Sequence, residues 1–445
     1  MLAIDNIPGA QNLLAEIESL RRQPTSEFEN FFSSKCLLGN GHGAESEYRL
    51  CNLVMQGGGV LGLAHVGFLY GLECAGIRVA CVAGTSAGSI VATAIVCARK
   101  GDIEPRVAGT LLGIIASMPM NQFLDGPASV RKLIKRCLAK RSLLNPGLWP
   151  GMLLALKRLL RVRGLNPGLE FEVWLARTFA SLGARSNTEL LAMLAKTHGQ
   201  LKAAGKLAYL FESDDENPPR PAGPEDLLKV IASSLPAGIK FTFPRDNEVL
   251  NGRYADASPA EFVRASMAIP GFFEPKYMDP NTTKWNGRVD RQFDKLASVS
   301  QRDEFMNTKP IAFVDGGLMS NLPVDAFHLT EAGEPSKESR RSAKEKIPTL
   351  VLTLVDKSAS TAYAFHTNLK GLVNDVVRLA NAVRLQRDRD AVNRVNKDNT
   401  IELVDIDTSG HNWLNFTMGE EEMGRLFMKG LLRAHEIIRN PEGVK

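Results

Sequence analysis

The fold class follows from residues 48–84, YRLCNLVMQGGGVLGLAHVGFLYGLECAGIRVACVAG. The apolar run at 48–56 predicts a strand, and GGGVLG at 57–62 predicts a tight turn. Residues 63–76 then predict a helix, and residues 77–84 predict a second strand. A strand, a helix and a strand in this order form a β-α-β unit, whose two strands run parallel in one sheet. The sequence therefore predicts an α/β fold.

The composition is that of a large globular protein with a mild basic excess. The chain has 445 residues, 44% of them apolar, which is enough for a substantial core. Its 54 Lys and Arg against 49 Asp and Glu give a net charge of +5, too diffuse to indicate a nucleic-acid partner and more in keeping with an anionic membrane surface. All six cysteines lie in the first third of the chain and none forms a C-x-x-C pair, which favours a reducing compartment and no metal.

The chain divides into a short N-terminal segment and one large domain. Residues 1–45 are expected to form a peripheral arm and linker, and residues 46–445 a single domain with a helical insertion at about 101–240. The N-terminus has no basic segment followed by an apolar one, so we expect no signal peptide and a cytoplasmic or peripheral membrane location. A specialised export route would leave no such mark. Residues 79–98 carry no charge, but their Gly, Ser and Thr fit a buried strand and helix better than a membrane span.

One segment of the predicted insertion is strongly amphipathic. In LWPGMLLALKRLLRVRG, residues 148–164, the five leucines at 153–160 are set against Lys157, Arg158, Arg161 and Arg163. A basic amphipathic helix of this kind can lie in a membrane interface. The same pattern also fits an ordinary helix that packs its leucines on the core and exposes its charges. The sequence leaves both interpretations open.

The glycine-rich turn at 57–62 matches G-x-G-x-x-G between a strand and a helix, as in dinucleotide-binding proteins. Such a site needs an acidic residue at the end of the next strand, and residues 77–84 contain none. The backbone N–H groups of Gly57, Gly58 and Gly59 could instead face an oxyanion. Alternatively, these glycines only allow the strand and helix to pack closely.

GTSAG, residues 84–88, matches G-x-S-x-G at a predicted strand-to-helix junction. In a nucleophile elbow the serine stands on a sharp turn, and the flanking glycines keep the approach to its oxygen open. The N-terminus of the following helix favours the negative charge that develops there. Ser86 is therefore the candidate nucleophile.

A nucleophilic serine needs a base, and two residues are candidates. Asp315 in IAFVDGG ends an apolar strand and precedes two glycines, although an aspartate there could equally cap the next helix. His411 in DTSGHNW fits the chain order of an α/β-hydrolase, which places its histidine last. His65 lies within the first helix and is expected to be a core histidine.

GGGVLG, GTSAG and DGG, in this order at strand ends, resemble the patatin-like phospholipase family. RASMAIPGFFEP at 264–275 resembles the family's Ala-Ser-x-x-x-Pro block, and residues 416–438 resemble its closing helix. The resemblance implies a three-layer α/β sandwich over residues 46–445, with a mainly parallel central sheet and a helical cap-like insertion.

The resemblance also implies a Ser-Asp dyad without histidine, in which Ser86 is the nucleophile, Asp315 is the base and Gly57 to Gly59 form the oxyanion hole. It implies hydrolysis of phospholipids or other lipid esters, of the phospholipase A or lysophospholipase type, at a membrane surface and without a metal or cofactor. The family usually has Arg or Lys where this chain has Leu61, which points to a less charged ester or to a cation from elsewhere. The insertion leaves room for an activating ligand or partner.

Two other functions stay open at this point. An α/β-hydrolase esterase would use Ser86 and His411 in a triad with an acidic residue. A non-catalytic lipid-binding module would keep the same fold and motifs without hydrolysing an ester.

Overall fold

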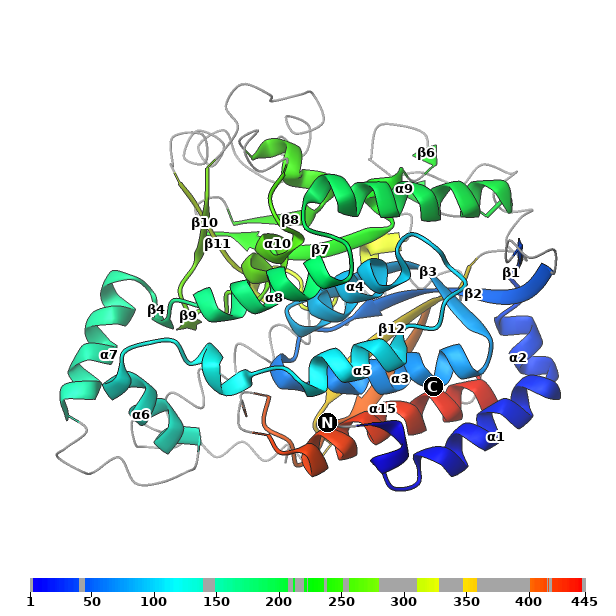
Figure 1. Cartoon of the computed structure of the whole chain (residues 1–445), viewed down its shortest axis with the longest axis horizontal. Helices are drawn as coiled ribbons and strands as arrows, with labels where there is room; N and C mark the ends of the chain where they lie inside the picture. Colours follow the sequence, from blue (N-terminus) through cyan, green and yellow to red (C-terminus); the bar gives the residue numbers. More distant parts are fainter. Residues whose placement is uncertain are drawn as a thin grey trace.

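A mixed sheet forms the centre of the molecule (Figure 1). The computed structural model describes residues 3–39, 45–138, 149–206, 211–212, 220–221, 223–235, 238–250, 256–279, 310–327, 347–357, 401–413, 415 and 418–441. Within these residues, nine strands join in the order β10-β11-β7-β3-β2-β12-β13, with β1 beside β2 and β8 beside β7. The strands are β1 (Lys35–Gly39), β2 (Glu45–Met55), β3 (Ile77–Thr85), β7 (Leu228–Ser234), β8 (Ile239–Phe243), β10 (Lys276–Met278), β11 (Ile311–Asp315), β12 (Thr349–Val355) and β13 (Ile401–Asp407).

The middle of the sheet is parallel, as the sequence predicts. The pairs β7-β3, β3-β2, β2-β12 and β12-β13 are parallel, whereas β10, β11, β8 and β1 pair antiparallel at the margins. All nine residues of β3 are buried. A parallel strand covered on both faces is expected to be apolar along its whole length, which explains the run IRVACVAG.

Helices cover the sheet on both sides. In Figure 1, α1, α3 and α15 lie below the central strands of the view, and α9 and α10 lie above them. The helices are α1 (Ala10–Arg22), α2 (Ser26–Phe31), α3 (Leu63–Cys74), α4 (Ala87–Arg99), α5 (Ala108–Ala116), α6 (Ala128–Leu138), α7 (Trp149–Arg161), α8 (Leu169–Ser181), α9 (Asn187–Ala203), α10 (Pro259–Ser266) and α15 (Glu420–Arg439). The predicted β-α-β unit is β2, α3 and β3, and α15 is the predicted closing helix.

Short strands and 3₁₀ turns complete the described chain. β4 (Gly164–Asn166) pairs with β9 (Gly271–Phe273), and β5 (Phe211–Glu212) pairs with β6 (Arg220–Pro221). The 3₁₀ turns that bear on the site are η2 (Gly59–Gly62), η3 (Met120–Phe123) and η9 (Gly316–Leu318). η2 lies within GGGVLG, η9 directly follows Asp315, and Met120 and Phe123 of η3 line the pocket described below.

The helical insertion expected at about 101–240 ends earlier in the structure than the sequence predicts. The described residues from 101 to the end of α9 are mainly helical, but β7 falls inside the range 101–240 and is a buried strand between β3 and β11. Its charged Lys229 interrupts the apolar pattern and obscures the strand in the sequence. The ammonium group of Lys229 is buried and donates to the carbonyl oxygen of Ala326 at 2.6 Å, which satisfies the charge inside the protein.

The N-terminal segment is packed against the domain. Ile17 on α1 and Phe28 on α2 are buried in the same core as the sheet. Strand β1 adds to the edge of β2, with Lys35 opposite Arg49 and Leu37 opposite Glu47. Residues 3–39 thus contribute to the body of the fold.

Candidate active site

Ser86 occupies a strained turn between β3 and α4. Its φ angle is 52°, a left-handed conformation that side chains other than glycine rarely adopt. Gly84 and Gly88 flank it, and a Cβ on Gly88 would overlap the carbonyl oxygen of Met55 at the end of β2. The strand-to-helix setting predicted for G-x-S-x-G is therefore present, with the serine at the N-terminus of α4.

Hydrogen bonds of its N–H, carbonyl and hydroxyl groups hold Ser86 in place. Its backbone N–H donates to Ser266 Oγ at 2.9 Å, and Ser266 Oγ in turn donates to the Ile231 carbonyl oxygen at 2.5 Å. The Ser86 carbonyl oxygen accepts from Ser89 Oγ, also at 2.5 Å. The Ser86 hydroxyl itself donates to Met267 Sδ at 3.0 Å. Ser266 and Met267 belong to the RASMAIP block, whose sequence shows a family likeness but not this contact with the serine.

Asp315 ends β11 at the same level of the sheet as Ser86. Thr85 pairs with Ile231, and the next residue of β7, Ala232, pairs with Asp315. The backbones of Thr85 and Asp315 are thus separated by two strand spacings, or about 10 Å. Ser86 and Asp315 are both largely buried, at 4% and 8% exposure.

The Asp315 carboxylate also caps the turn that follows it. Its Oδ1 accepts the backbone N–H of Gly317 at 2.7 Å, at the start of η9. This bond confirms that Asp315 caps the following turn, and its role as the base stays a prediction. Gly316 brings the turn close to the nucleophile strand, since a Cβ there would stand 3.0 Å from Thr85 Cγ2.

The glycine loop continues β2 and lies against Ser86. A Cβ on Gly57 would stand 2.9 Å from Ser86 Cβ and 2.6 Å from Asn321 Oδ1. The N–H of Gly57 donates to the Asn321 carbonyl oxygen at 3.2 Å. In the part of the chain that the structure describes, the N–H groups of Gly58 and Gly59 make no hydrogen bond. These two amides remain the stronger oxyanion candidates of the three glycines.

Asn321 is a site residue that the motifs did not single out. It is buried, and its Oδ1 has no hydrogen-bond partner among the described residues. An unpaired buried amide oxygen is costly, and here it faces the glycine loop. The signal in the sequence is its place six residues after Asp315, in DGGLMSN.

Neither His65 nor His411 contacts the serine hydroxyl in the described part of the chain. His65 is fully buried, and burial lowers its pKa from 6.5 to about 4 although the Gln56 carbonyl opposes the shift. The ring is therefore neutral near pH 7, and Nε2 donates to the Gln56 carbonyl at 3.0 Å, just before the glycine loop. His411 Nδ1 lies 3.2 Å from Glu422 Oε1 on α15, and no contact joins His411 to Ser86 in the described residues.

An apolar pocket opens beside the serine. It is narrow and partly open to solvent, and it begins at Gly59, Ala87 and Met267, of which Ala87 directly follows Ser86. Its walls come from α3, α4, α5, η3, α8 and β9, and their apolar side chains include Val60, Leu63, Ile90, Val91, Ile115, Met118, Met120, Phe123, Phe171 and Phe273. Such a pocket suits a hydrocarbon chain. Leu61 is buried but does not line it.

Metal-binding clusters and cysteine thiols were the other candidate groups, and the described residues give the following picture. No cluster of three His, Cys, Asp or Glu side chains able to hold a metal occurs among them. The described thiols of Cys51, Cys74, Cys81 and Cys97 are buried and unpaired, and burial raises the pKa of each. A buried thiol with a raised pKa is a poor nucleophile.

A family model for patatin-like phospholipases matches residues 53–328, which is more than half of the chain. The chain belongs to the patatin-like phospholipase family. Membership supports a lipid hydrolase function, with lipids as the substrate class. A search of curated proteins finds no match. Among solved structures, the patatin-like chain is similar to VipD from Legionella pneumophila, with 16% identity, a TM-score of 0.37, and coverage of 91% of this chain and 70% of that one.

The uncharged run at 79–98 is divided between two elements of the patatin-like fold. Its first part belongs to β3 and its second part to α4. Within the described ranges, no helix has both the length and the apolar character needed to cross a membrane.

Proposed function

We propose that this protein hydrolyses acyl esters of membrane lipids through a Ser-Asp dyad. The observation that carries the proposal is the position of Ser86, which lies at the N-terminus of α4 between the glycine loop and an apolar pocket. The pocket would hold an acyl chain, and the ester carbonyl carbon would then lie at the serine oxygen. Cleavage of one acyl chain corresponds to an activity of the phospholipase A or lysophospholipase type.

In the first half of the reaction, Ser86 Oγ attacks the ester carbonyl carbon and its proton passes to the Asp315 carboxylate. The carbonyl oxygen gains the negative charge, which the N–H groups of Gly58 and Gly59 and the N-terminus of α4 stabilise. The tetrahedral intermediate then collapses, the C–O bond of the leaving alcohol breaks, and the alcohol takes the proton from Asp315. An acyl-serine remains.

In the second half, Asp315 takes a proton from water, and the resulting hydroxide attacks the acyl-serine carbonyl. Collapse of the second intermediate returns the proton to Ser86 and releases the fatty acid. The contact of Ser86 Oγ with Met267 Sδ must be given up for the first step. A thioether is a weak acceptor, so this loss is small.

The decisive test is fatty-acid release by the purified protein from mixed phospholipid vesicles and from a soluble monomeric ester. Ser86→Ala and Asp315→Asn should each reduce release from both substrates by about a thousandfold or more. Ser117→Ala, which removes an exposed hydroxyl bonded only within α5, is the matched control and should leave the rate unchanged. Release that persists in Ser86→Ala would contradict the proposal, as would no release from either substrate by the unmodified chain.

The alternative with a histidine base is distinguished by one further variant. His411→Gln should retain release from the monomeric ester, because the ring bonds Glu422 and supports the turn next to Trp413. The Trp413 carbonyl oxygen accepts the N–H of Val60 at 3.0 Å, so a modest indirect effect on the glycine loop is expected. A loss as large as that of Ser86→Ala would favour the triad.

A further inference from the structure

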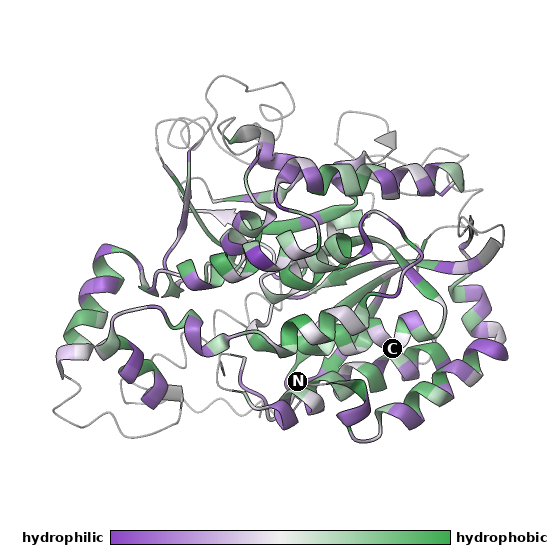
Figure 2. Cartoon of the chain, in the orientation of Figure 1, coloured by the Kyte–Doolittle hydropathy of each residue, from purple (hydrophilic) through white to green (hydrophobic). Residues whose placement is uncertain are grey.

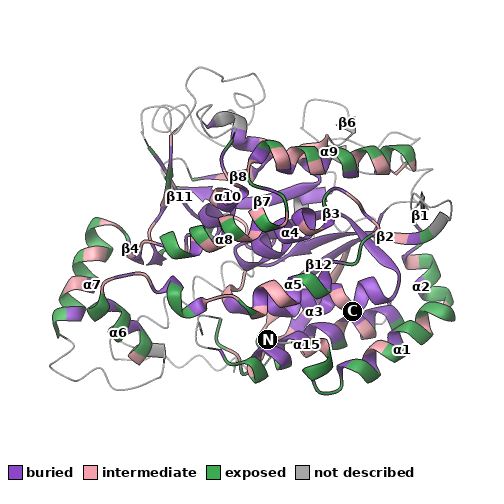
Figure 3. Ribbon diagram, viewed as in Figure 1, coloured by how far each residue is buried: buried purple, intermediate pink, exposed green. Residues whose placement is uncertain are grey.

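The apolar face of α7 points into solvent. Trp149, Leu153, Leu156 and Leu160 recur at spacings of four, three and four residues, which places them on one face of the helix. They are 65%, 68%, 55% and 76% exposed. Figures 2 and 3 show α7 at the left-hand end of the view, bearing hydrophobic and exposed residues together.

The opposite face of α7 packs on the protein through small residues. Gly151 and Ala155 are buried, and a Cβ on Gly151 would stand 2.8 Å from the carbonyl oxygen of Ser129 on α6. Arg158 on the same side forms an ion pair with Glu274. The leucine side is therefore the outer side, which is the reverse of an ordinary surface helix. This arrangement argues against the interpretation in which the leucines of residues 148–164 pack on the core, and the membrane interpretation stays a prediction.

The basic excess of the chain is concentrated in this region. Residues 126–163 contain ten Lys and Arg and no Asp or Glu, and the rest of the chain has 44 Lys and Arg against 49 Asp and Glu. Arg131, Lys132 and Lys135 on α6 are exposed, as are Lys157 and Arg161 on α7. The charge that looks diffuse over the whole sequence is thus local.

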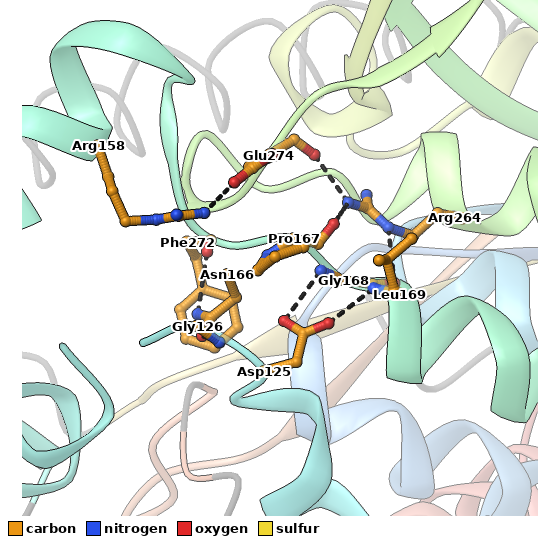
Figure 4. Close-up of polar contacts among 10 residues, drawn as sticks. All are labelled: Asp125, Gly126, Arg158, Asn166, Pro167, Gly168, Leu169, Arg264, Phe272 and Glu274. Atoms are coloured by element: carbon orange, nitrogen blue, oxygen red, sulfur yellow. Dashed lines mark hydrogen bonds and ion pairs between the residues drawn. The ribbon is translucent and has the colours of Figure 1, made fainter. Parts of the chain in front are cut away.

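The helical pair α6 and α7 is anchored to the wall of the apolar pocket. Figure 4 shows that Arg264 on α10 donates to the carbonyl oxygens of Pro167, Gly168 and Glu274, at 2.6, 3.2 and 2.8 Å. Asp125, just before α6, accepts the N–H groups of Gly168 and Leu169 at the start of α8. Arg264 therefore links the base of the pair to α10.

The same framework continues to the nucleophile. Ser266, two residues after Arg264, ends α10 and accepts the N–H of Ser86. Two of the pocket walls also adjoin this helical pair. The η3 turn shortly precedes α6 in the chain, and β9 pairs with β4, which shortly follows α7. A partner bound to α6 and α7 would therefore lie next to the apolar pocket.

We propose that α6 and α7 form a docking surface for a bilayer that contains anionic phospholipids. The exposed leucines and Trp149 would enter the acyl boundary of the bilayer, and the flanking lysines and arginines would contact the phosphate groups. This inference rests on the proposed function, because docking here would bring the substrate lipid to the pocket. A nucleic acid would use the charges but leave the leucines in water, so the combination of both favours a membrane.

The experiment measures binding without hydrolysis. Ser86→Ala protein is sedimented with vesicles of phosphatidylcholine alone, and with vesicles of phosphatidylcholine mixed with phosphatidylglycerol. We expect binding to the anionic vesicles, weakened when salt is raised, and at least about fivefold weaker binding to the neutral vesicles. Adding Leu153→Asp and Leu160→Asp should reduce binding to the anionic vesicles by about tenfold or more. Leu432→Asp, at an exposed leucine on α15, is the matched control and should bind as its parent does.

A second variant set tests the charges and guards against misfolding. Arg131→Gln, Lys132→Gln and Lys157→Gln together should weaken anionic binding by about tenfold or more while leaving the thermal unfolding midpoint unchanged. In the Ser86-containing protein, neither the leucine nor the charge variants should change hydrolysis of the soluble monomeric ester. If the proposed function is wrong, the Ser86-containing protein will not hydrolyse the soluble ester. If only the docking proposal is wrong, the ester is hydrolysed and the vesicle-binding results alone differ from those expected.

Three results would overturn the docking proposal. The first is the absence of vesicle binding by the parent. The second is equal binding by the parent and the leucine variant. The third is binding to a short DNA duplex that is as tight as binding to anionic vesicles and does not change in the leucine variant.

Discussion

Replacing Ser266 by alanine removes the hydroxyl group that holds the backbone of the candidate nucleophile. Ser266 is fully buried, accepts the N–H of Ser86 at 2.9 Å and donates to the Ile231 carbonyl oxygen at 2.5 Å. No other acceptor is bonded to the Ser86 N–H in the described residues. The substitution therefore leaves one buried donor unpaired and removes one of the bonds to a β7 carbonyl group.

The magnitude follows from these two groups. An unpaired buried N–H costs about 1–3 kcal/mol, and loss of the second bond adds about 1 kcal/mol, so the free energy of unfolding should fall by about 2–4 kcal/mol. Ser86 also holds a left-handed φ of 52°, a conformation that costs about 1–3 kcal/mol and persists only where neighbours impose it. Without Ser266 the elbow can relax, and a displacement of about 1 Å at a reacting atom can reduce the rate by about a hundredfold.

The assay compares denaturant unfolding with hydrolysis of a soluble monomeric ester. Thr197→Val is the matched control, because Thr197 Oγ1 is buried on α9 and donates to the Gly101 carbonyl oxygen at 2.9 Å, away from the site. Both variants should lose stability, but only Ser266→Ala should lose kcat by about 10- to 100-fold at temperatures where each variant is folded. Equal kcat in the two variants would refute the argument that Ser266 positions the nucleophile.

Three further predictions concern the supports of the site. The pKa of His65 is about 4 in the fold against 6.5 for an exposed ring, so stability present above pH 6.5 should fall by about 3 kcal/mol as the pH drops to about 4; His65→Gln should flatten this pH dependence in denaturant titrations. Gly316→Ala would push a Cβ into the Ile231 carbonyl oxygen, so we expect more than about a tenfold loss of ester hydrolysis with a lower unfolding midpoint; normal activity would contradict the close approach. Arg264→Met leaves three backbone carbonyls without their donor and should lower the free energy of unfolding by about 3 kcal/mol or more, measured by denaturant unfolding, whereas Arg433→Met on α15 should cost less than about 1 kcal/mol.

The sequence predicted where the motifs lie in the fold, because each is a local pattern. A strand followed by G-x-S-x-G needs only its own residues to form an elbow, and Ser86 lies at the predicted junction. The strand before Asp315 was likewise readable from its apolar run. β7 was missed, because Lys229 breaks the pattern and its ammonium group is satisfied by Ala326, a residue distant in the chain. The role of α7 was undecided for a similar reason, since periodicity does not tell which side of a helix faces the protein.

The sequence by itself determined the α/β class, the β-α-β unit around GGGVLG and the identity of Ser86 and Asp315 as candidates. Only the tertiary structure decided that Ser266 and Met267 contact the serine, that Asn321 lies against the glycine loop, and that the leucines of α7 face outward. The physical reason is the range of the forces involved. Turn geometry and strand propensity act between neighbours in the chain, whereas hydrogen bonds to a buried N–H and the burial of a helix face depend on segments that meet only after folding.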